Sequence, residues 1–236
     1  TRTGAVDVMD APTFRNYVIN SFGADSPQAA ALGNTETNWQ DEIFHVAAST
    51  DHNLSLSGSA GEILPYRVSV GYTNENGILR TSHLERYTAS VNLSPSFFDD
   101  RLRVQLNARG MYNTNRFADQ GAINSATQFD PTMPVYAESP SDYGNGYYMT
   151  LKPDGTPIDI ALANPLAILM QKHDNSEVMR SIGNIQLDYK MPFLEELRAN
   201  LNLGYDISKS DGKVIIEDNS PMSYTWGNYK SGWGEN

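Results

Sequence analysis

The chain has 236 residues, a formal net charge of −11, and no cysteine. The acidic balance argues against a nucleic-acid partner, which requires a basic surface, and the absence of cysteine excludes disulfides and thiolate metal sites. No run of about 20 apolar residues predicts a transmembrane helix, although membrane-spanning strands alternate and escape that criterion. From the abrupt start at "TRTGAVDVMD" and the end at "KSGWGEN" we expect a segment of a longer protein.

Residues 1–51 predict the edge of a strand region and an outer loop that carries two short helices. A proline two residues after Asp10 is typical of a helix start and predicts a helix over 10–22. Asn38 precedes "WQDEIFHVA" and has the side chain of a good N-cap, so we expect a second helix over 38–48.

Residues 52–114 predict four antiparallel strands, because apolar and polar residues alternate with a period of two. In "PYRVSVGYT" the apolar side chains fall on one face, and Arg67 and Ser69 fall on the other. The dipeptide Asn76-Gly77 is favoured in primed hairpin turns and predicts a hairpin tip. The four strands are expected near 52–59, 65–74, 84–94 and 101–114.

Residues 115–181 are rich in Gly, Pro, Asn and Ser, which predicts a long outer loop. We expect a small hairpin turning at Asp154-Gly155 and a short helix over 164–172, because Asn164 is followed by proline. The remaining chain predicts two strands in 182–209, near 182–191 and 196–209, and the start of another outer loop over 210–236.

The connections differ in length at the two ends of the predicted sheet. Short turns at 59–64, 94–100 and 191–196 fall at one end, and the hairpin tip and long loops fall at the other. Short turns on one rim, long loops on the other and tyrosines near the strand ends are typical of outer-membrane barrels. The sequence therefore predicts an all-β fold: about six strands of an antiparallel, up-and-down transmembrane β-barrel. A soluble surface β-domain that binds glycan or a host protein is the alternative.

Six short motifs support this prediction by resemblance. The runs "WQDEIF", "NLSLSG", "YRVSVGY", "NGIL" and "RYTASVNL" follow one another between residues 39 and 93, and "NPLAIL" begins at Asn164. In type, order and spacing they resemble the barrel region just after the plug in the SusC/RagA family of TonB-dependent outer-membrane transporters. The match covers most of residues 35–208.

The resemblance implies a large barrel of about 22 strands with a plugged lumen, in the outer membrane of a Gram-negative bacterium. It also implies nutrient import driven by the TonB complex through a plug region that lies outside this chain. A SusD-like surface lipoprotein is the implied partner, with oligosaccharides or peptides as the substrates. The family gives no reason to expect an enzyme or a cofactor.

Candidate site residues follow from position rather than from a catalytic motif. Ser49, Asp51 and His52 lie close in sequence, but neighbouring residues in a strand point to opposite faces, so no triad is expected. The four histidines lack metal-ligand spacing. Aromatic side chains in polar loops can stack against sugars or peptides. The candidates for substrate contact are Tyr143, Tyr147, Tyr148, Trp226 and Tyr229. The arginines on the polar strand face, expected to line the lumen, are Arg67, Arg103, Arg109 and Arg198.

Overall fold

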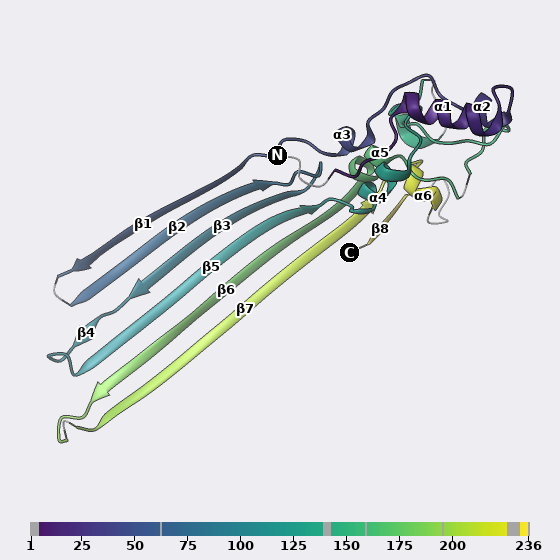
Figure 1. The fold of residues 1–236 in the computed structure, drawn as a ribbon. Helices are drawn as coiled ribbons and strands as arrows, with labels where there is room; N and C mark the ends of the chain where they lie inside the picture. Colours follow the sequence, from purple (N-terminus) through teal and green to yellow (C-terminus); the bar gives the residue numbers. More distant parts are fainter. Residues whose placement is uncertain are drawn as a thin grey trace.

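The protein is described by a computed structural model that covers residues 5–61, 63–138, 143–158, 160–194, 196–225 and 232–235. Long antiparallel strands form one sheet, and the helices gather at one of its ends (Figure 1). The strands are β1 (Ser49–Ala60), β2 (Leu64–Asn76), β3 (His83–Leu93), β4 (Ser96–Phe97), β5 (Leu102–Phe117), β6 (Lys172–Lys190), β7 (Arg198–Ile216) and β8 (Trp233–Glu235).

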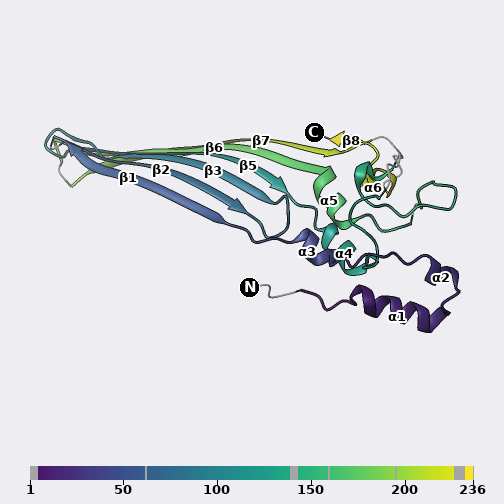
Figure 2. The same ribbon diagram turned by 90° about the horizontal axis from the view of Figure 1, so that it is seen from above.

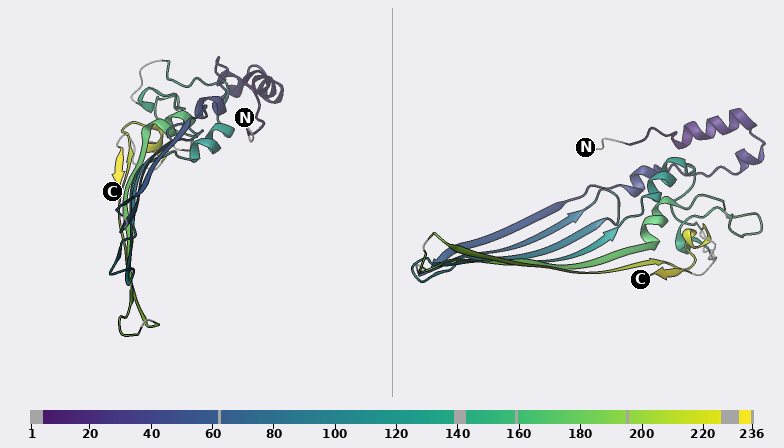
Figure 3. Two further views of the ribbon diagram at one scale, coloured as in Figure 1. Left: turned by 90° about the vertical axis from the view of Figure 1, so that its left-hand side faces the viewer. Right: turned by 90° about the horizontal axis from the view of Figure 1, so that it is seen from below.

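Each long strand pairs with its neighbour in sequence, as the alternation predicted. The order in the sheet is β1-β2-β3-β5-β6-β7-β8, and β4 is a short addition that pairs with β5. Seen edge-on, the strands form a single layer (Figure 3). Within the described residues the sheet is open, so β1 and β8 lack the second neighbour that a closed barrel provides.

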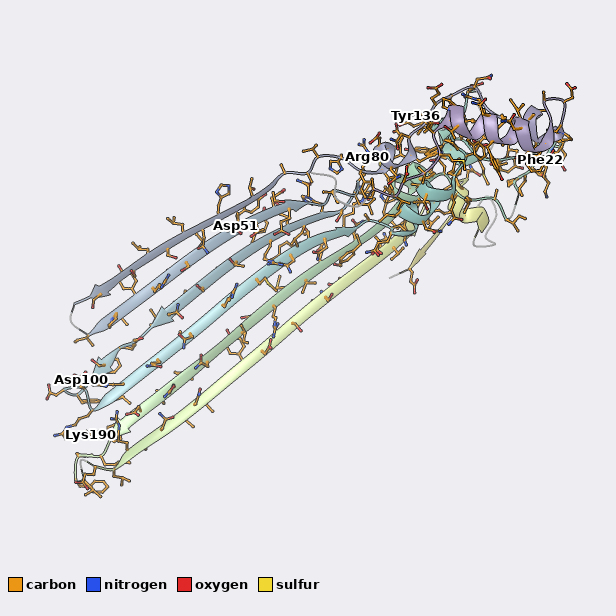
Figure 4. All side chains as sticks on the ribbon, viewed as in Figure 1. Phe22, Asp51, Arg80, Asp100, Tyr136 and Lys190 are labelled. Carbon is orange, nitrogen blue, oxygen red and sulfur yellow. The ribbon has the colours of Figure 1, made fainter. Side chains whose placement is uncertain are left out.

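The helices lie beyond the ends of the strands. They are α1 (Ala11–Phe22), α2 (Pro27–Ala30), α3 (Trp39–Ile43), α4 (Gly121–Gln128), α5 (Pro165–Gln171) and α6 (Pro221–Thr225), with a 3-10 turn at Gly144–Gly146. We call these helices and the loops between them the loop cluster. It occupies one end of the sheet, and the short turns lie at the other (Figure 2). Asp100 and Lys190 mark the turn end in Figure 4. This placement confirms the predicted orientation.

Two strand boundaries were predicted wrongly. β6 begins at Lys172 rather than at 182, so residues 172–181, which were assigned to the outer loop, belong to the sheet. β7 likewise continues to Ile216 instead of ending at 209. The stretch "KHDNSEVMRS" carries no consistently apolar face. Strand prediction depends on alternation, and this part of the strand extends beyond the apolar band of the sheet.

The helix predicted over 38–48 is shorter than expected, since α3 ends at Ile43. The next two residues leave the helix to pair with the β2–β3 hairpin tip. Phe44 forms an antiparallel bridge with Leu79, and the His45 N–H donates to Ile78 O at 2.9 Å. Tertiary pairing therefore overrides a favourable helix sequence.

The hairpin tip itself differs from the predicted primed turn. Asn76 is the last residue of β2, and the Gly77 N–H donates to Ser82 O at 2.9 Å, which makes the tip longer than two residues. The left-handed residue is Thr81, with φ 72°. The smaller hairpin was predicted correctly, with φ 81° at Gly155.

The hydrophobic core lies in the loop cluster. Ile43 is fully buried and Leu169 is 1% exposed. Both pack in one cluster that joins four helices and the hairpin tip to the top of β7, and its members are Trp39, Ile43, Leu79, Ala122, Ala126, Phe129, Ile168, Leu169, Ile216 and Met222. The sheet below this cluster contributes none of these residues except Ile216.

Two glycines on the apolar sheet face are covered by tyrosines. Gly183 pairs with Tyr205 across β6 and β7, and a Cβ at Gly183 would lie 2.6 Å from the Tyr205 ring. Gly58 pairs with Tyr66 in the same way, with the Tyr66 hydroxyl 2.8 Å from such a Cβ. An aromatic ring laid over a cross-strand glycine protects the exposed backbone and helps to fix the register.

Candidate functional site

One face of the sheet is an ordered apolar surface. Leu54 pairs with Val70, and Val70 pairs with Ala89, so apolar side chains of three strands lie side by side. The row below continues with Val68 opposite Val91. Val70 is 51% exposed and Leu54 is 71% exposed, and no layer within the described part of the chain covers them.

A row of tyrosines marks the upper edge of this apolar face. Tyr72, Tyr87 and Tyr112 are direct partners across three strands, and the rings of the first two lie 5.1 Å apart. Their hydroxyls point toward the loop cluster. Tyr72 and Tyr87 donate to Glu85 at 3.0 and 2.8 Å, and Tyr112 donates to Glu177 at 3.2 Å. Apolar rings below and polar groups above are typical of a membrane interface.

The height of the apolar face matches a bilayer. Along β5 it extends from Leu102 to Tyr112, both on the same face of the strand. That distance is about 33 Å at about 3.3 Å per residue. Strands tilted by about 40° rise about 25 Å over this length, which is the height of the apolar band of outer-membrane barrels.

The opposite face is polar and hydrogen-bonded between strands. Ser55 and Ser69 hydroxyls lie 2.9 Å apart, and the Asn107 amide donates to the Asn184 carbonyl at 3.1 Å. A shallow hollow of about 700 Å³ lies over β3, β5, β6 and β7. Its polar lining residues are Ser90, Asn92, Asn107, Arg109, Asn184 and Asp206.

The four predicted arginines all lie on this polar face. The register places Arg67 opposite Ser57 and Asn92, and Arg109 opposite Ser90. Both side chains are exposed. Their proposed role in lining a lumen stays a prediction.

The other two arginines lie lower on the polar face, near Asp188. Arg103 is exposed and is the register partner of Asp188 on β6. Arg198 donates through Nε to Asp188 Oδ1 at 3.0 Å.

One ion pair on the polar face was missed by sequence reasoning. Arg180 on β6 donates through Nε to Asp206 Oδ1 on β7 at 2.9 Å. Arg180 lies outside the strand predicted near 182–191, and Ile182 interrupts the polar pattern between Arg180 and Asn184. Alternate residues of a strand share a face, so counting back in steps of two from Asp188 places Arg180 on the polar face. This alternation was the sequence signal that could have predicted the position of Arg180.

The candidate tyrosines occupy different positions in the loop cluster. Tyr148 packs against the hydrophobic core, with its ring 6.4 Å from Phe129 in an edge-on arrangement. Tyr147 pairs with Tyr136, with ring centroids 5.3 Å apart. Burial raises the pKa of the Tyr147 and Tyr148 hydroxyls, so each is a neutral donor at physiological pH. Tyr143 is half-buried and precedes the 3-10 turn. Trp226 and Tyr229 lie outside the described residues.

A second hollow lies within the loop cluster and was not predicted. It has a volume of about 750 Å³ and lies between the N-terminal segment, α1, α3 and the end of α4. The N-terminal segment is held there by two bonds between the Val6 backbone and the Gln40 amide, at 3.0 and 2.7 Å. Carboxylates and aromatic rings share the lining, which includes Asp7, Asp10, Phe14, Glu36, Trp39 and Asp130.

Among the described residues, no group of three or more histidines and carboxylates is arranged to hold a metal ion. No described helix is long and apolar enough to cross a membrane.

The sequence is similar to TonB-dependent receptors. It is 41% identical over 238 aligned residues to the TonB-dependent receptor SusC of Bacteroides thetaiotaomicron, across 96% of this chain and 23% of that protein. The resemblance to the SusC/RagA family is confirmed. The chain is also 26% identical to the TonB-dependent receptor P3 of Formosa agariphila, across 85% of this chain and 19% of that protein. No protein-family model matches the chain.

The fold is similar to that of solved RagAB structures. Superposition on a RagAB peptide importer in its closed-closed state gives a TM-score of 0.58 at 18% identity, across 93% of this chain and 24% of that one. A RagAB peptide transporter gives a TM-score of 0.59 at 17% identity, across 90% and 24%. The chain thus spans between about a sixth and a quarter of the length of the relatives it matches, and these structures support the fold alone.

Proposed function

We propose that this chain forms part of the wall and the outer loops of a TonB-dependent outer-membrane transporter. The observation that carries the proposal is the apolar sheet face, which is ordered in rows, bounded by tyrosines and uncovered within the described residues. An apolar surface of this size is a liability in water. A bilayer supplies the missing apolar phase, and only closed barrels or helices cross it without unpaired backbone groups.

In this arrangement the polar face lines the lumen and the loop cluster lies outside the cell. The imported substrates are oligosaccharides or peptides, in keeping with the likeness to SusC and to the RagAB peptide importer. A SusD-like lipoprotein covers the outer side, and the TonB complex acts through a plug region outside this chain. Arg67, Arg103, Arg109 and Arg198 contact the lumen contents, and the loop tyrosines are the substrate-contact candidates.

The faces of β2 provide a direct test in the full-length protein. Val70 and Ser69 are adjacent but point to opposite faces, so each can be replaced by a cysteine that carries a spin label. We expect the label at Val70→Cys to be relaxed by oxygen, which dissolves in lipid, and the label at Ser69→Cys by a water-soluble nickel complex. Relaxation by the nickel complex at both positions would favour the soluble surface domain instead.

Transport needs a separate measurement. Cells that carry the full-length protein should take up a labelled oligosaccharide or peptide, and uptake should stop when the TonB energy supply or the partner lipoprotein is removed. Uptake that persists without the TonB complex would contradict an energised importer while leaving the barrel assignment intact.

A further inference from the structure

A small polar pocket lies where the sheet meets the loop cluster. It has a volume of about 400 Å³ and lies between the β2–β3 hairpin tip, the segment after α3, and the tops of β5 and β6. Arg80, labelled in Figure 4, marks this junction. The side chains that matter for the argument are His45, Thr81, Ser82, His83, Arg116 and Asn175.

Three buried polar atoms in this pocket lack a hydrogen-bond partner. They are His45 Nδ1, Thr81 Oγ1 and Arg116 Nε. Within the described residues only one other buried side-chain atom is unsatisfied, Gln171 Oε1 in α5. Buried polar groups are normally paired, and an orphaned donor needs an explanation. Three orphans in one pocket indicate that a polar ligand completes it.

Thr81 is also held in an unfavourable backbone conformation. Its φ of 72° is rare for a β-branched residue, and glycine would adopt it without strain. The hairpin tip enforces this turn, because the Arg80 N–H donates to Ile43 O at 2.9 Å and the Ser82 N–H donates to Leu79 O at 3.2 Å. A strained residue with an unsatisfied hydroxyl is typical of a ligand site.

The pocket carries the positive charge of Arg116 and no carboxylate, although the protein as a whole is acidic. No Asp or Glu lines it, whereas Arg116 and two histidines do. The carboxylates on the same face of the sheet are already engaged. Glu85 accepts from two tyrosine hydroxyls and Glu177 from one. The Arg116 guanidinium keeps its Nε–H free for a ligand while Nη2 contacts His173 at 3.4 Å. Guanidinium and hydroxyl donors together suit an oxyanion.

The position of Arg116 suggests the source of that oxyanion. Arg116 lies four residues above Tyr112 on β5 and on the same, apolar-face side. Four residues rise about 10 Å at about 3.3 Å each and a tilt of about 40°. In the proposed barrel this places the pocket on the outer wall, just above the tyrosine row and level with the lipid head groups.

We propose that this pocket binds a phosphate group, presented by a phosphorylated lipid of the outer leaflet. Arg116 Nε and the Thr81 hydroxyl donate to the phosphate oxygens, with His45 as a third donor. The binding chemistry stands on the pocket alone, and only the lipid as its source rests on the proposed function. An anchored head group would fix the hairpin tip and, through Leu79, the loop cluster above it.

The experiment uses the full-length protein purified in detergent. It measures binding of phosphate from two sources. In the first arm, inorganic phosphate is added and thermal stability is compared with chloride at matched ionic strength. In the second arm, a phosphorylated glycolipid and its dephosphorylated form are supplied in nanodiscs, and native mass spectrometry counts the retained lipid. Neither readout depends on transport.

Two variants and one control separate binding from folding. Arg116→Gln removes a charged donor and should weaken phosphate binding at least about tenfold. Thr81→Gly relieves the strained φ, so it should preserve or raise the stability of the apo-protein while weakening binding about threefold to tenfold. Arg101→Gln removes the same charge at the opposite rim, where the side chain is exposed, and should leave binding unchanged.

The outcomes distinguish the two parts of the proposal. Retention of phosphorylated glycolipid that depends on Arg116 and Thr81 supports it in full. Binding of inorganic phosphate alone supports the oxyanion site and overturns the lipid source. Equal behaviour of Arg116→Gln, Arg101→Gln and the native protein in both arms would overturn the site, because the three orphaned atoms would then bind only water.

Discussion

The sheet and the loop cluster place the same residue types in opposite environments. In the cluster, Ile43 and Leu169 are buried, with exposed fractions of 0% and 1%. In the sheet, Leu203 is 57% exposed and Ile207 is 65% exposed, although they continue a regular apolar face. The cluster is built like a small soluble protein, whereas the sheet depends on a partner phase to cover its apolar side.

This contrast explains how one chain can serve two surroundings. The strand extensions, from Lys172 to Val178 on β6 and from Ser210 to Ile215 on β7, lie between the apolar band and the cluster. They carry the backbone hydrogen bonds of the sheet beyond the tyrosine row. The cluster is thereby held on a rigid support, where ligand-contacting loops are most precisely positioned.

The sharpest test of the contrast is a matched pair of Leu→Ala substitutions in the full-length protein. Leu169→Ala creates a cavity in the closed core of the cluster and should destabilise it by about 2–5 kcal/mol. Leu203→Ala lies on the uncovered sheet face and leaves no closed cavity, so its cost should be much smaller. Hydrogen exchange of α4 and α5 amides measures the first effect, and equal losses for both variants would contradict the distinction.

The second test breaks the apolar face with a charge. Val68 lies two rows below the tyrosines, so Val68→Arg should cost about 2–4 kcal/mol near the bilayer midplane and should impair assembly of the full-length protein. Ser69→Arg, one residue away on the polar face, should assemble normally and could alter transport. Heat-modifiable migration of the assembled barrel on gels provides the measurement. The reverse result would mean that the two faces are assigned backwards.

Much of the sheet could be predicted because its two faces differ. Alternation located every long strand and placed Arg67 and Val70 on the correct relative faces, since a one-residue slip would invert the whole pattern. Prediction failed where this difference ends, as in residues 172–181. Neither face is apolar there, so the strand is fixed by pairing with β5 and β7 and not by local pattern.

The loop cluster could be predicted only where local signals were strong. The helix cap at Asn164 and the turn at Gly155 are local signals, and both were found. The packing of Tyr148 on Phe129 and the strained Thr81 arise from contacts between segments far apart in the sequence. No short motif encodes such contacts, so the pocket around Arg116 became visible only in three dimensions.

A third prediction concerns the cap that ties α5 to the rest of the cluster. Asn164 is 1% exposed, and its Oδ1 accepts from the Leu166 and Ala167 N–H groups at 3.1 and 3.2 Å. Its Nδ2 donates to Val135 O at 2.8 Å. Asn164→Ala loses the cap and the amide hydrogen bond to Val135 O, at a cost of about 1–3 kcal/mol. Val135 O keeps its bond from the Tyr148 N–H at 3.0 Å. Exchange should accelerate in α5 and not in β2, and acceleration in both would indicate a global effect.

The smallest effect is expected at α1, on the surface of the cluster. Asp10 caps this helix, accepting from the Thr13 N–H at 2.9 Å. The hydroxyl and the N–H of Thr13 stabilise the carboxylate and lower the pKa of Asp10. A lowered folded-state pKa means that the cap contributes fully above the unfolded value, near pH 4, and is lost as the pH falls through the folded value.

Asp10→Asn provides the matched control for that titration, because asparagine caps equally well and does not titrate. We expect protection of the α1 amides to be similar in the two proteins at pH 6. Below about pH 4 the native protein should lose protection relative to Asp10→Asn, as protonation removes its acceptor charge. Taking the ratio of exchange rates at each pH cancels the intrinsic pH dependence of exchange. A ratio that stays constant from pH 6 to pH 3 would show that the carboxylate charge adds nothing to this cap.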